Sequence, residues 1–459
     1  MPSNQRPLTG KTKYKKVGAD SRVDLYGKVL FVFSLGFFLA SVLFSLGSRS
    51  VTSNTSYSTA TRKGSRCDPF EQPGFVQPPR SAQDIATWRN FDPSCQPSSL
   101  LSTLLTKLDP SRDASQPSNK RKPHSTTLAE NELYSFLSNR TVLLIGDLVD
   151  RTLVKHFCTI VGHKAQAVDR NHPWGEALYN VPTKHIFPNT QSGTGYDGNA
   201  KPKIAESVAL AHYCYLPEYD FLITSVYSYG ADTSDFWHLQ ESYHPPSLYE
   251  HRISDLYFPY LKSLASKAST SPALPKPRQS VTPDLIFFNS GFWDLARWSQ
   301  QDITNGNSAI SDLTEERLLW WRSRMVDMLS ATRKAWPASR IVWRDTHYPV
   351  ASEASTVEWF LGQNDAQSRK NHPLFHTSRI AQINNARQAT LSPHGDDVVK
   401  GKLSRSARMP KGVASAPIGS MTLGQDHHSI DPLNPGLNPT GAIFSEMMLW
   451  QLRAAVEGS

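Results

Sequence analysis

The polar residues best suited to chemistry stand at the ends of apolar runs. Asp147 directly follows the run Thr141–Gly146, and a helical pattern begins immediately after it. A strand that turns straight into a helix offers backbone N–H groups and the positive helix end to a developing oxyanion, so this turn suits a nucleophile. Asn289 follows a second apolar run, and Asp431 follows a His-His pair near the C-terminus. Such residue types serve acyl transfer, in which a base activates a nucleophile and an Asp orients the base.

Four short apolar runs are predicted to be the buried strands that position these residues. They are Thr141–Gly146, Tyr219–Ser228, Pro283–Gly291 and Ser339–His347. Amphipathic helical segments intervene at Val149–Val161, Leu313–Trp336 and Gly441–Ala455. Because parallel neighbours need crossover connections, the alternation predicts an α/β fold with a mostly parallel sheet and helices on both faces. In such sheets the ligand site lies beyond the carboxyl ends of the strands.

An uncharged run near the N-terminus, Val29–Ser48, is predicted to be a transmembrane helix. Its 20 residues, at about 1.5 Å each, span the roughly 30 Å hydrocarbon core. Seven basic residues precede it against two acidic ones, so residues 1–28 are expected to stay cytoplasmic and the rest to be lumenal. A cleaved signal peptide or a buried core helix is the alternative, but the run is longer than the usual signal-peptide core of about 7–15 residues.

Composition divides the remainder of the chain. Residues 49–66 are rich in Ser and Thr and have no hydrophobic period, which predicts a stem before a folded domain at 67–459. Within that domain, 109–127 and 263–282 are polar or rich in Ser, Ala and Pro, so both are predicted to be surface insertions. The net charge is +9, but no basic-aromatic motif accompanies it, so nucleic acid is not an expected partner.

The four cysteines form an even set in a chain expected to face an oxidising lumen, which predicts two disulfides. Three pairings are possible, and the more local one joins Cys67 to Cys95 and Cys158 to Cys214. No C-x-x-C motif or Cys/His cluster argues for zinc, and neither a metal nor a cofactor is expected. Asn54 and Asn139 begin N-x-S/T sequons that a lumenal protein could use for glycosylation.

Several stretches resemble the SGNH/GDSL hydrolases, in particular the membrane-anchored PC-esterase branch that includes trichome birefringence-like polysaccharide O-acetyltransferases and similar fungal proteins. The turn Gly146–Arg151, followed by a helix with Phe-Cys, resembles block I of that family. Phe287–Leu295 resembles the branch's Asn-(Ser/Thr)-Gly-x-Trp block. Cys67–Val76 with Trp88–Cys95 is similar to its disulfide-linked N-terminal region, and Asp431–Arg453 to its terminal D-x-x-H-P block and closing helix.

The resemblance implies an SGNH-like three-layer α/β/α sandwich in a single-pass type II protein of the secretory pathway, namely the Golgi. It implies an ancestral reaction of acyl-ester cleavage or O-acetyl transfer on glycans. It also implies site roles for four residues that this chain retains: Asp147, the oxyanion-stabilising Asn289, the orienting Asp431, and Gly230 as an oxyanion glycine.

Two departures from the family pattern fall on its reactive side chains. The serine nucleophile falls on Leu148, and the histidine of the D-x-x-H block falls on Asn434. Leucine cannot attack a carbonyl, and an asparagine amide cannot act as a general base near neutral pH. The leading interpretation is therefore a catalytically silent member, a pseudoenzyme retained for glycan binding or for association with an active relative.

The alternative is a working esterase or O-acetyltransferase with an unrecognised nucleophile, in which a shifted loop brings His427 or His428 to the base position. His347 could also face the site, although a strand-end histidine hydrogen-bonded to a neighbour is the simpler interpretation. Arg151 could meet a polyhydroxyl ligand or pair with a neighbouring carboxylate. Trp320 lies in an amphipathic helix and is predicted to be core rather than a sugar platform.

Overall fold

The computed structural model describes residues 67–81, 84–109, 134–179, 210–234, 236–237, 243–266, 277, 280–350, 374–392 and 410–458. All of them belong to one unit, Arg66–Ser459. The predicted tail, transmembrane segment and stem lie outside the described residues, and so does the sequon at Asn54. Within the described part, no helix is both long enough and apolar enough to cross a membrane.

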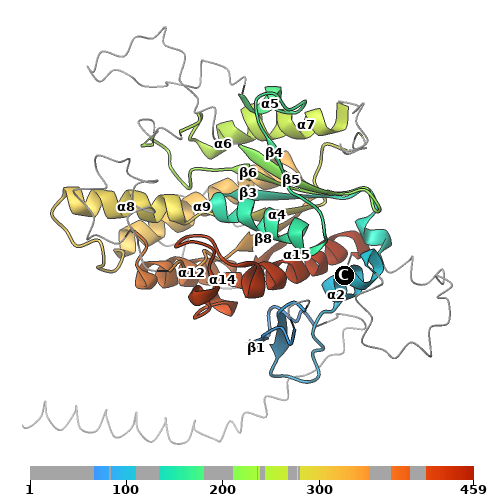
Figure 1. Ribbon diagram of the computed structural model, residues 1–459. Coiled ribbons are helices and arrows are strands. Elements are labelled where there is room, and N and C mark those ends of the chain that lie inside the picture. The colour runs from blue at the N-terminus through green and yellow to red at the C-terminus, as the bar shows by residue number, and fades with distance from the viewer. Residues whose placement is uncertain are drawn as a thin grey trace, which may run out of the picture. The chain divides into compact units, whose positions relative to one another are not determined.

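A seven-stranded sheet with the order β4-β5-β6-β3-β7-β8-β9 forms the centre of this unit (Figure 1). Its strands are β3 (Thr141–Gly146), β4 (Gln166–Val168), β5 (Ala211–Leu216), β6 (Phe221–Tyr227), β7 (Leu285–Phe288), β8 (Arg340–Arg344) and β9 (Val413–Ala416). The four predicted strands are β3, β6, β7 and β8, and they are neighbours in the sheet. The prediction of an α/β fold with a mostly parallel sheet is confirmed.

One side of the sheet departs from the parallel arrangement. Strands β6, β3, β7, β8 and β9 run parallel to one another, whereas β5 is antiparallel to both β4 and β6. Only residues 217–220 connect β5 to β6, and Asp220 there adopts a left-handed conformation with a φ of 48°. A connection this short makes a hairpin, because a parallel pair needs a crossover of a dozen or more residues.

Helices cover both faces of the sheet. On β7, Phe287 packs against Phe444 with ring centroids 5.1 Å apart, and the next residue, Phe288, packs against Tyr249 at 5.4 Å. Successive side chains of a strand point to opposite faces. Helix α15 (Ala442–Glu457), which holds Phe444, and helix α6 (Tyr249–Arg252), which holds Tyr249, therefore lie on opposite faces of the sheet. Helix α4 (Leu148–Ile160) packs against α15, and Figure 1 shows α6 and α7 (Phe258–Ser266) together on the other side.

Three of the helices match predicted segments: α4 (Leu148–Ile160), α9 (Glu315–Ala335) and α15 (Ala442–Glu457). The others are α2 (Leu100–Leu108), α5 (Glu176–Tyr179), α6 (Tyr249–Arg252), α7 (Phe258–Ser266), α8 (Phe292–Thr304), α12 (Thr377–Leu391) and α14 (Ile418–Met421). Helix α7 corrects the predicted insertion at 263–282, because it continues to Ser266 and buries Leu264. Of the insertion predicted at 109–127, only Asp109 is described.

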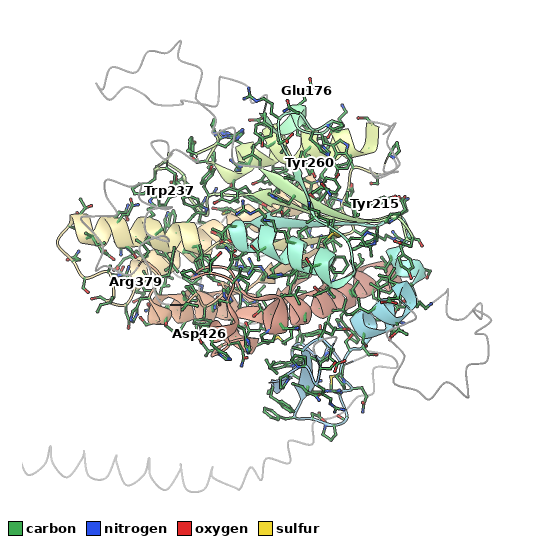
Figure 2. All side chains as sticks on the ribbon, in the orientation of Figure 1. Glu176, Tyr215, Trp237, Tyr260, Arg379 and Asp426 are labelled. Atoms are coloured by element: carbon green, nitrogen blue, oxygen red, sulfur yellow. A yellow bond between two sulfur atoms is a disulfide. The ribbon has the colours of Figure 1, made fainter. Side chains whose placement is uncertain are left out.

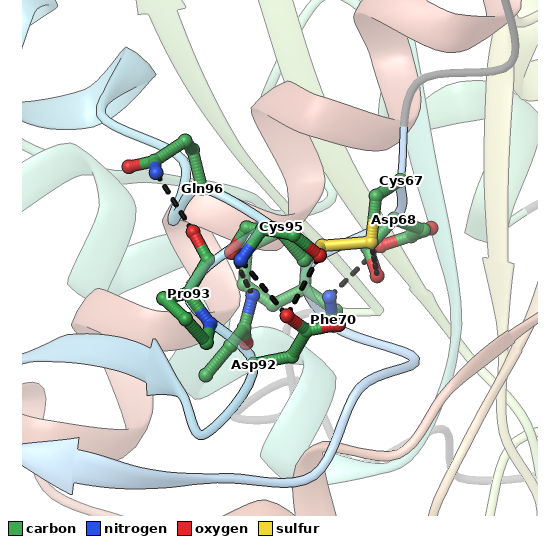
Figure 3. The surroundings of a disulfide bond; sticks show 9 residues. Cys67, Asp68, Phe70, Asp92, Pro93, Cys95 and Gln96 are labelled. Atoms are coloured by element: carbon green, nitrogen blue, oxygen red, sulfur yellow. Dashed lines mark hydrogen bonds between the residues drawn. A yellow bond between two sulfur atoms is a disulfide. The ribbon is translucent and has the colours of Figure 1, made fainter.

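The N-terminal part of the domain is a small disulfide-linked segment. Strands β1 (Gly74–Gln77) and β2 (Thr87–Asn90) form an antiparallel pair. The Cys67–Cys95 disulfide closes the segment, as Figure 3 shows. A second disulfide joins Cys158 on α4 to Cys214 on β5, and both of these cysteines are fully buried. Both predicted disulfides are confirmed, with the more local pairing.

Candidate functional site

The turn between β3 and α4 is held by a reciprocal cap. The Asp147 carboxylate accepts a hydrogen bond from the N–H of Val149 at 2.9 Å, and the Asp150 carboxylate accepts one from the N–H of Asp147 at 3.1 Å. A Cβ placed on Gly146 would lie 1.9 Å from Oδ2 of Asp150. Glycine is therefore required at the end of β3, because only glycine lets the Asp150 carboxylate approach the backbone so closely.

Leu148 is the first residue of α4, and its side chain belongs to the hydrophobic core. The residue is 5 % exposed. At this position the resemblance expects a nucleophile facing a substrate. The helix instead begins with a buried hydrocarbon that has no lone pair or acidic proton, so this position supplies no nucleophilic chemistry.

A buried ion pair connects the start of α4 to the end of β8. Arg344 contacts both carboxylate oxygens of Asp150, at 3.1 Å from Nε and 2.8 Å from Nη2, and neither residue is more than 1 % exposed. The Arg344 carbonyl accepts a hydrogen bond from Nδ2 of Asn289 at 2.9 Å, while Oδ1 of Asn289 has no partner in the part of the chain that the structure describes. The carboxyl ends of β3, β7 and β8 therefore meet, and they bring Asn289 beside the turn that holds Asp147.

This cluster alters the acidity of Asp147. Burial, and second the negative charge of Asp150, raise the pKa of Asp147 to about 7, although the Arg344 guanidinium opposes the shift. Arg151, the sequence-based candidate partner for these carboxylates, forms no ion pair with either of them; Arg344 takes that place with Asp150. Since Arg344 is 194 residues from Asp150, no local pattern in the sequence pointed to this pair.

Gly230 faces a carboxylate. It has a φ of +77°, and a Cβ there would lie 2.6 Å from Oδ1 of Asp294. The same oxygen accepts the N–H of Ala231 at 2.8 Å, and Ser290 and Trp321 also donate to Asp294. Burial raises the pKa of Asp294 to about 6. The backbone N–H of Ala231, the residue after Gly230, is thus already hydrogen-bonded within the protein.

Asn434 bridges α4 and its own loop. Its Nδ2 donates to Oδ2 of Asp431 at 2.9 Å, and its Oδ1 accepts from the Thr152 hydroxyl at 2.7 Å. Thr152 lies one helical turn beyond Leu148, since four residues complete about one turn. The loop before α15 therefore lies against the helix that starts at Leu148. Both polar atoms of the Asn434 side chain are occupied by structural hydrogen bonds.

The two alternative bases lie on the surface. His427 and His428 follow Asp426 in a single 3-10 turn, and both are exposed, with ring centroids 4.0 Å apart. Asp426 is labelled in Figure 2. Neither imidazole hydrogen-bonds to another residue in the described part of the chain, and Asn434, rather than either histidine, contacts α4.

His347 is buried three residues after the end of β8, and neither of its ring nitrogens has a hydrogen-bond partner among the described residues. The described residues therefore do not supply the hydrogen bond to a neighbour that the sequence predicted. Burial, and second the charge of Arg344, lower the pKa of His347 to about 3, so the ring is neutral at physiological pH. A neutral imidazole without a partner keeps one donor and one acceptor nitrogen.

Among the remaining candidates, Asn139 is half-buried and has a φ of 57° in the turn before β3.

Comparisons of the chain with protein-family models, characterised proteins and solved structures returned no match. The resemblance to the SGNH hydrolases and the roles that it implies therefore remain predictions.

Proposed function

We propose that this chain is a membrane-anchored, lumenal SGNH-like protein that does not perform serine-ester chemistry and instead binds glycans. The observation that carries the proposal is the buried side chain of Leu148 at the first residue of α4. An acyl-enzyme needs a hydroxyl, thiol or similar group at this position, and a hydrocarbon cannot form one. The proposed protein is a pseudoenzyme of the PC-esterase type.

The hydrogen bonds of Asn434, at the position where the resemblance places the histidine base, support the same proposal. Its amide donates to Asp431, the carboxylate that would orient a histidine, and accepts from Thr152. An amide does not titrate near neutral pH, so it cannot take a proton from a nucleophile or from water. The position of the nucleophile is thus held by the core side chain of Leu148, and the position of the base by the amide of Asn434, whose hydrogen bonds are structural.

The proposed compartment has separate support. Two disulfides persist in oxidising environments such as the secretory lumen and are rare in reducing compartments, and the described part of the chain contains no free cysteine. The membrane anchor rests on the uncharged run Val29–Ser48 and its basic flank. The Golgi location and the glycan ligand class rest on the family resemblance, and an active relative is the proposed partner if no glycan binds.

Ester turnover tests the proposal. The full-length protein in detergent is incubated with p-nitrophenyl acetate and with an acetylated xylo-oligosaccharide, beside the His427→Ala and His428→Ala variants. We expect no release of acetate above that of heat-denatured protein in any sample. Turnover by the unmodified protein that disappears in either histidine variant would reject the proposal and support a working esterase.

A further inference from the structure

A hollow of about 240 Å³ lies between α8 and α9. Six residues line it: Arg297, Trp298, Gln301, Glu316, Arg317 and Trp320. On each helix the three lining residues fall at positions i, i+1 and i+4, and the last is a surface neighbour of the other two, which lie four and three residues before it. We call this hollow the α8/α9 groove. It is lined by two indoles and by side chains that can donate and accept hydrogen bonds.

The two indoles form a corner in the α8/α9 groove. The rings of Trp298 and Trp320 have centroids 6.2 Å apart and planes inclined at 75°. Trp298 is only 4 % exposed and belongs to the core. Trp320, which the sequence predicted to be core, is half-buried and packs against the core, so it is the indole of the pair with an accessible surface. An indole face is apolar and carries negative electrostatic potential, so it suits the C–H bonds on the face of a pyranose ring.

The two arginines line the groove without an excess of positive charge. Arg297 pairs with Asp232 at 2.7 Å. Arg317 pairs at 2.8 Å with Asp302, which it shares with Arg379, and the Glu316 carboxylate also lines the groove. Both aspartates are buried. A guanidinium has five N–H donors, so each arginine keeps donors beyond those its aspartate uses. Compensated guanidinium groups suit neutral hydroxyls better than phosphate or sulfate, whose binding relies on uncompensated positive charge.

The size of the α8/α9 groove limits the ligand. Sites for drug-sized molecules measure roughly 300–1,000 Å³, so a hollow of about 240 Å³ suits a single sugar ring of a longer chain.

We propose that the α8/α9 groove is a glycan-binding subsite in which the accessible part of Trp320 packs on the face of a neutral pyranose ring, while the buried Trp298 forms part of the apolar wall. Arg297, Arg317 and Gln301 would hydrogen-bond to its hydroxyls. This inference rests on the proposed glycan-binding function and assigns it a location and a ligand class.

Binding of neutral hexasaccharides tests the proposal. The full-length protein in detergent is titrated by calorimetry with the β-linked hexasaccharides of glucose, xylose and mannose, and with a sulfated heparin hexasaccharide. We expect at least one neutral hexasaccharide to bind, and Trp320→Ala to weaken that binding about tenfold or more, which is about 1.4 kcal/mol. Trp450→Ala is the matched control, because Trp450 is another half-buried tryptophan, on α15, and its loss should leave affinity unchanged.

A second variant keeps the test decisive if Trp320→Ala unfolds. Gln301→Leu removes the amide donor from the groove wall, and we expect it to weaken the same hexasaccharide. Equal binding by the unmodified protein and by the folded variants would place the glycan elsewhere and overturn the subsite, while the glycan-binding function would stand. No binding of any neutral hexasaccharide, or tighter binding of the sulfated one, would also overturn it. The ester-turnover assay tests the proposed loss of catalysis separately from this binding experiment.

Discussion

At the scale of single residues, Asp147 has two roles that can be separated. Its carboxylate caps α4, and burial together with the charge of Asp150 raises its pKa from 3.8 to about 7. A carboxyl whose pKa is higher in the folded state binds a proton that the unfolded chain releases. Its contribution to stability is therefore present below about pH 3.8 and is lost as the pH rises towards about 7.

Asp147→Asn should remove this pH dependence, because asparagine keeps a capping oxygen but does not titrate. We expect the free energy of unfolding of the unmodified protein to fall more steeply across this pH range than that of the variant. The difference should be on the order of 1 kcal/mol or more. Urea unfolding at several pH values measures both slopes, and parallel slopes would mean that the pKa of Asp147 is not raised.

The buried pair of Arg344 and Asp150 gives a second prediction at this scale. Arg344→Met leaves the Asp150 carboxylate without its counter-charge in a fully buried position, so it should destabilise the fold by about 3–5 kcal/mol. Arg140→Met is the matched control, because the Arg140–Asp284 pair is partly exposed and should be worth about 0–1 kcal/mol. Equal losses of unfolding free energy in the two variants, measured by chemical denaturation, would contradict the larger contribution expected of the buried pair.

At the scale of elements, a side chain of the last helix, α15, caps the N-terminus of α2. The Glu446 carboxylate on α15 accepts the N–H groups of Leu100 and Leu101, at 2.7 and 2.8 Å, and also the Ser98 hydroxyl. These N–H groups belong to the first turn of α2, whose donors have no partner within their own helix. Glu446 thus ties the N-terminal segment of the domain to its last helix.

Glu446→Ala should leave these buried donors without a partner and cost about 2 kcal/mol or more. Glu457→Ala is the comparison on the same helix, since Glu457 forms an i,i+4 pair with Arg453 near the surface, a kind of pair worth about 0.3–0.5 kcal/mol. Thermal unfolding of both variants measures the difference. A smaller loss for Glu446→Ala than for Glu457→Ala would show that the cap does not stabilise α2.

The sequence predicted the elements that follow simple patterns. Continuous apolar runs indicated the four central parallel strands, and Asp147 and Asn289 both lie at the carboxyl edge where the sequence predicted the ligand site. Strand β5 was missed because its sequence, AHYCYL, mixes polar and aromatic residues and resembles no buried run. The pair of Asp150 with Arg344 could not be predicted, because it depends on how β3 and β8 are placed across β7.

At the scale of the whole molecule, two disulfides stabilise different parts of the domain. Cys158–Cys214 spans 56 residues and Cys67–Cys95 spans 28, and doubling a loop adds only about 0.6 kcal/mol to its closure. Burial separates them further, because Cys158 and Cys214 are fully buried, whereas Cys67 is exposed. Removing the Cys158–Cys214 bridge should therefore be the more damaging change.

We expect the double variant Cys158→Ala/Cys214→Ala to lose about 3–5 kcal/mol of unfolding free energy, more than Cys67→Ala/Cys95→Ala loses. Urea denaturation of the two variants, prepared under identical conditions, provides the comparison. A larger loss for the N-terminal bridge would show that the disulfide-linked N-terminal segment, rather than the contact between α4 and β5, limits the stability of the domain.

The most direct test of the central claim is labelling by a fluorophosphonate, which reacts with activated serines. Full-length protein and the Leu148→Ser/Asn434→His variant are treated in parallel and compared on a gel. Because the residue at the start of α4 is a buried leucine, we expect no label on the unmodified protein. Label on the variant would show that the site geometry survives. Covalent labelling of the unmodified protein would contradict the proposal that it performs no serine-ester chemistry.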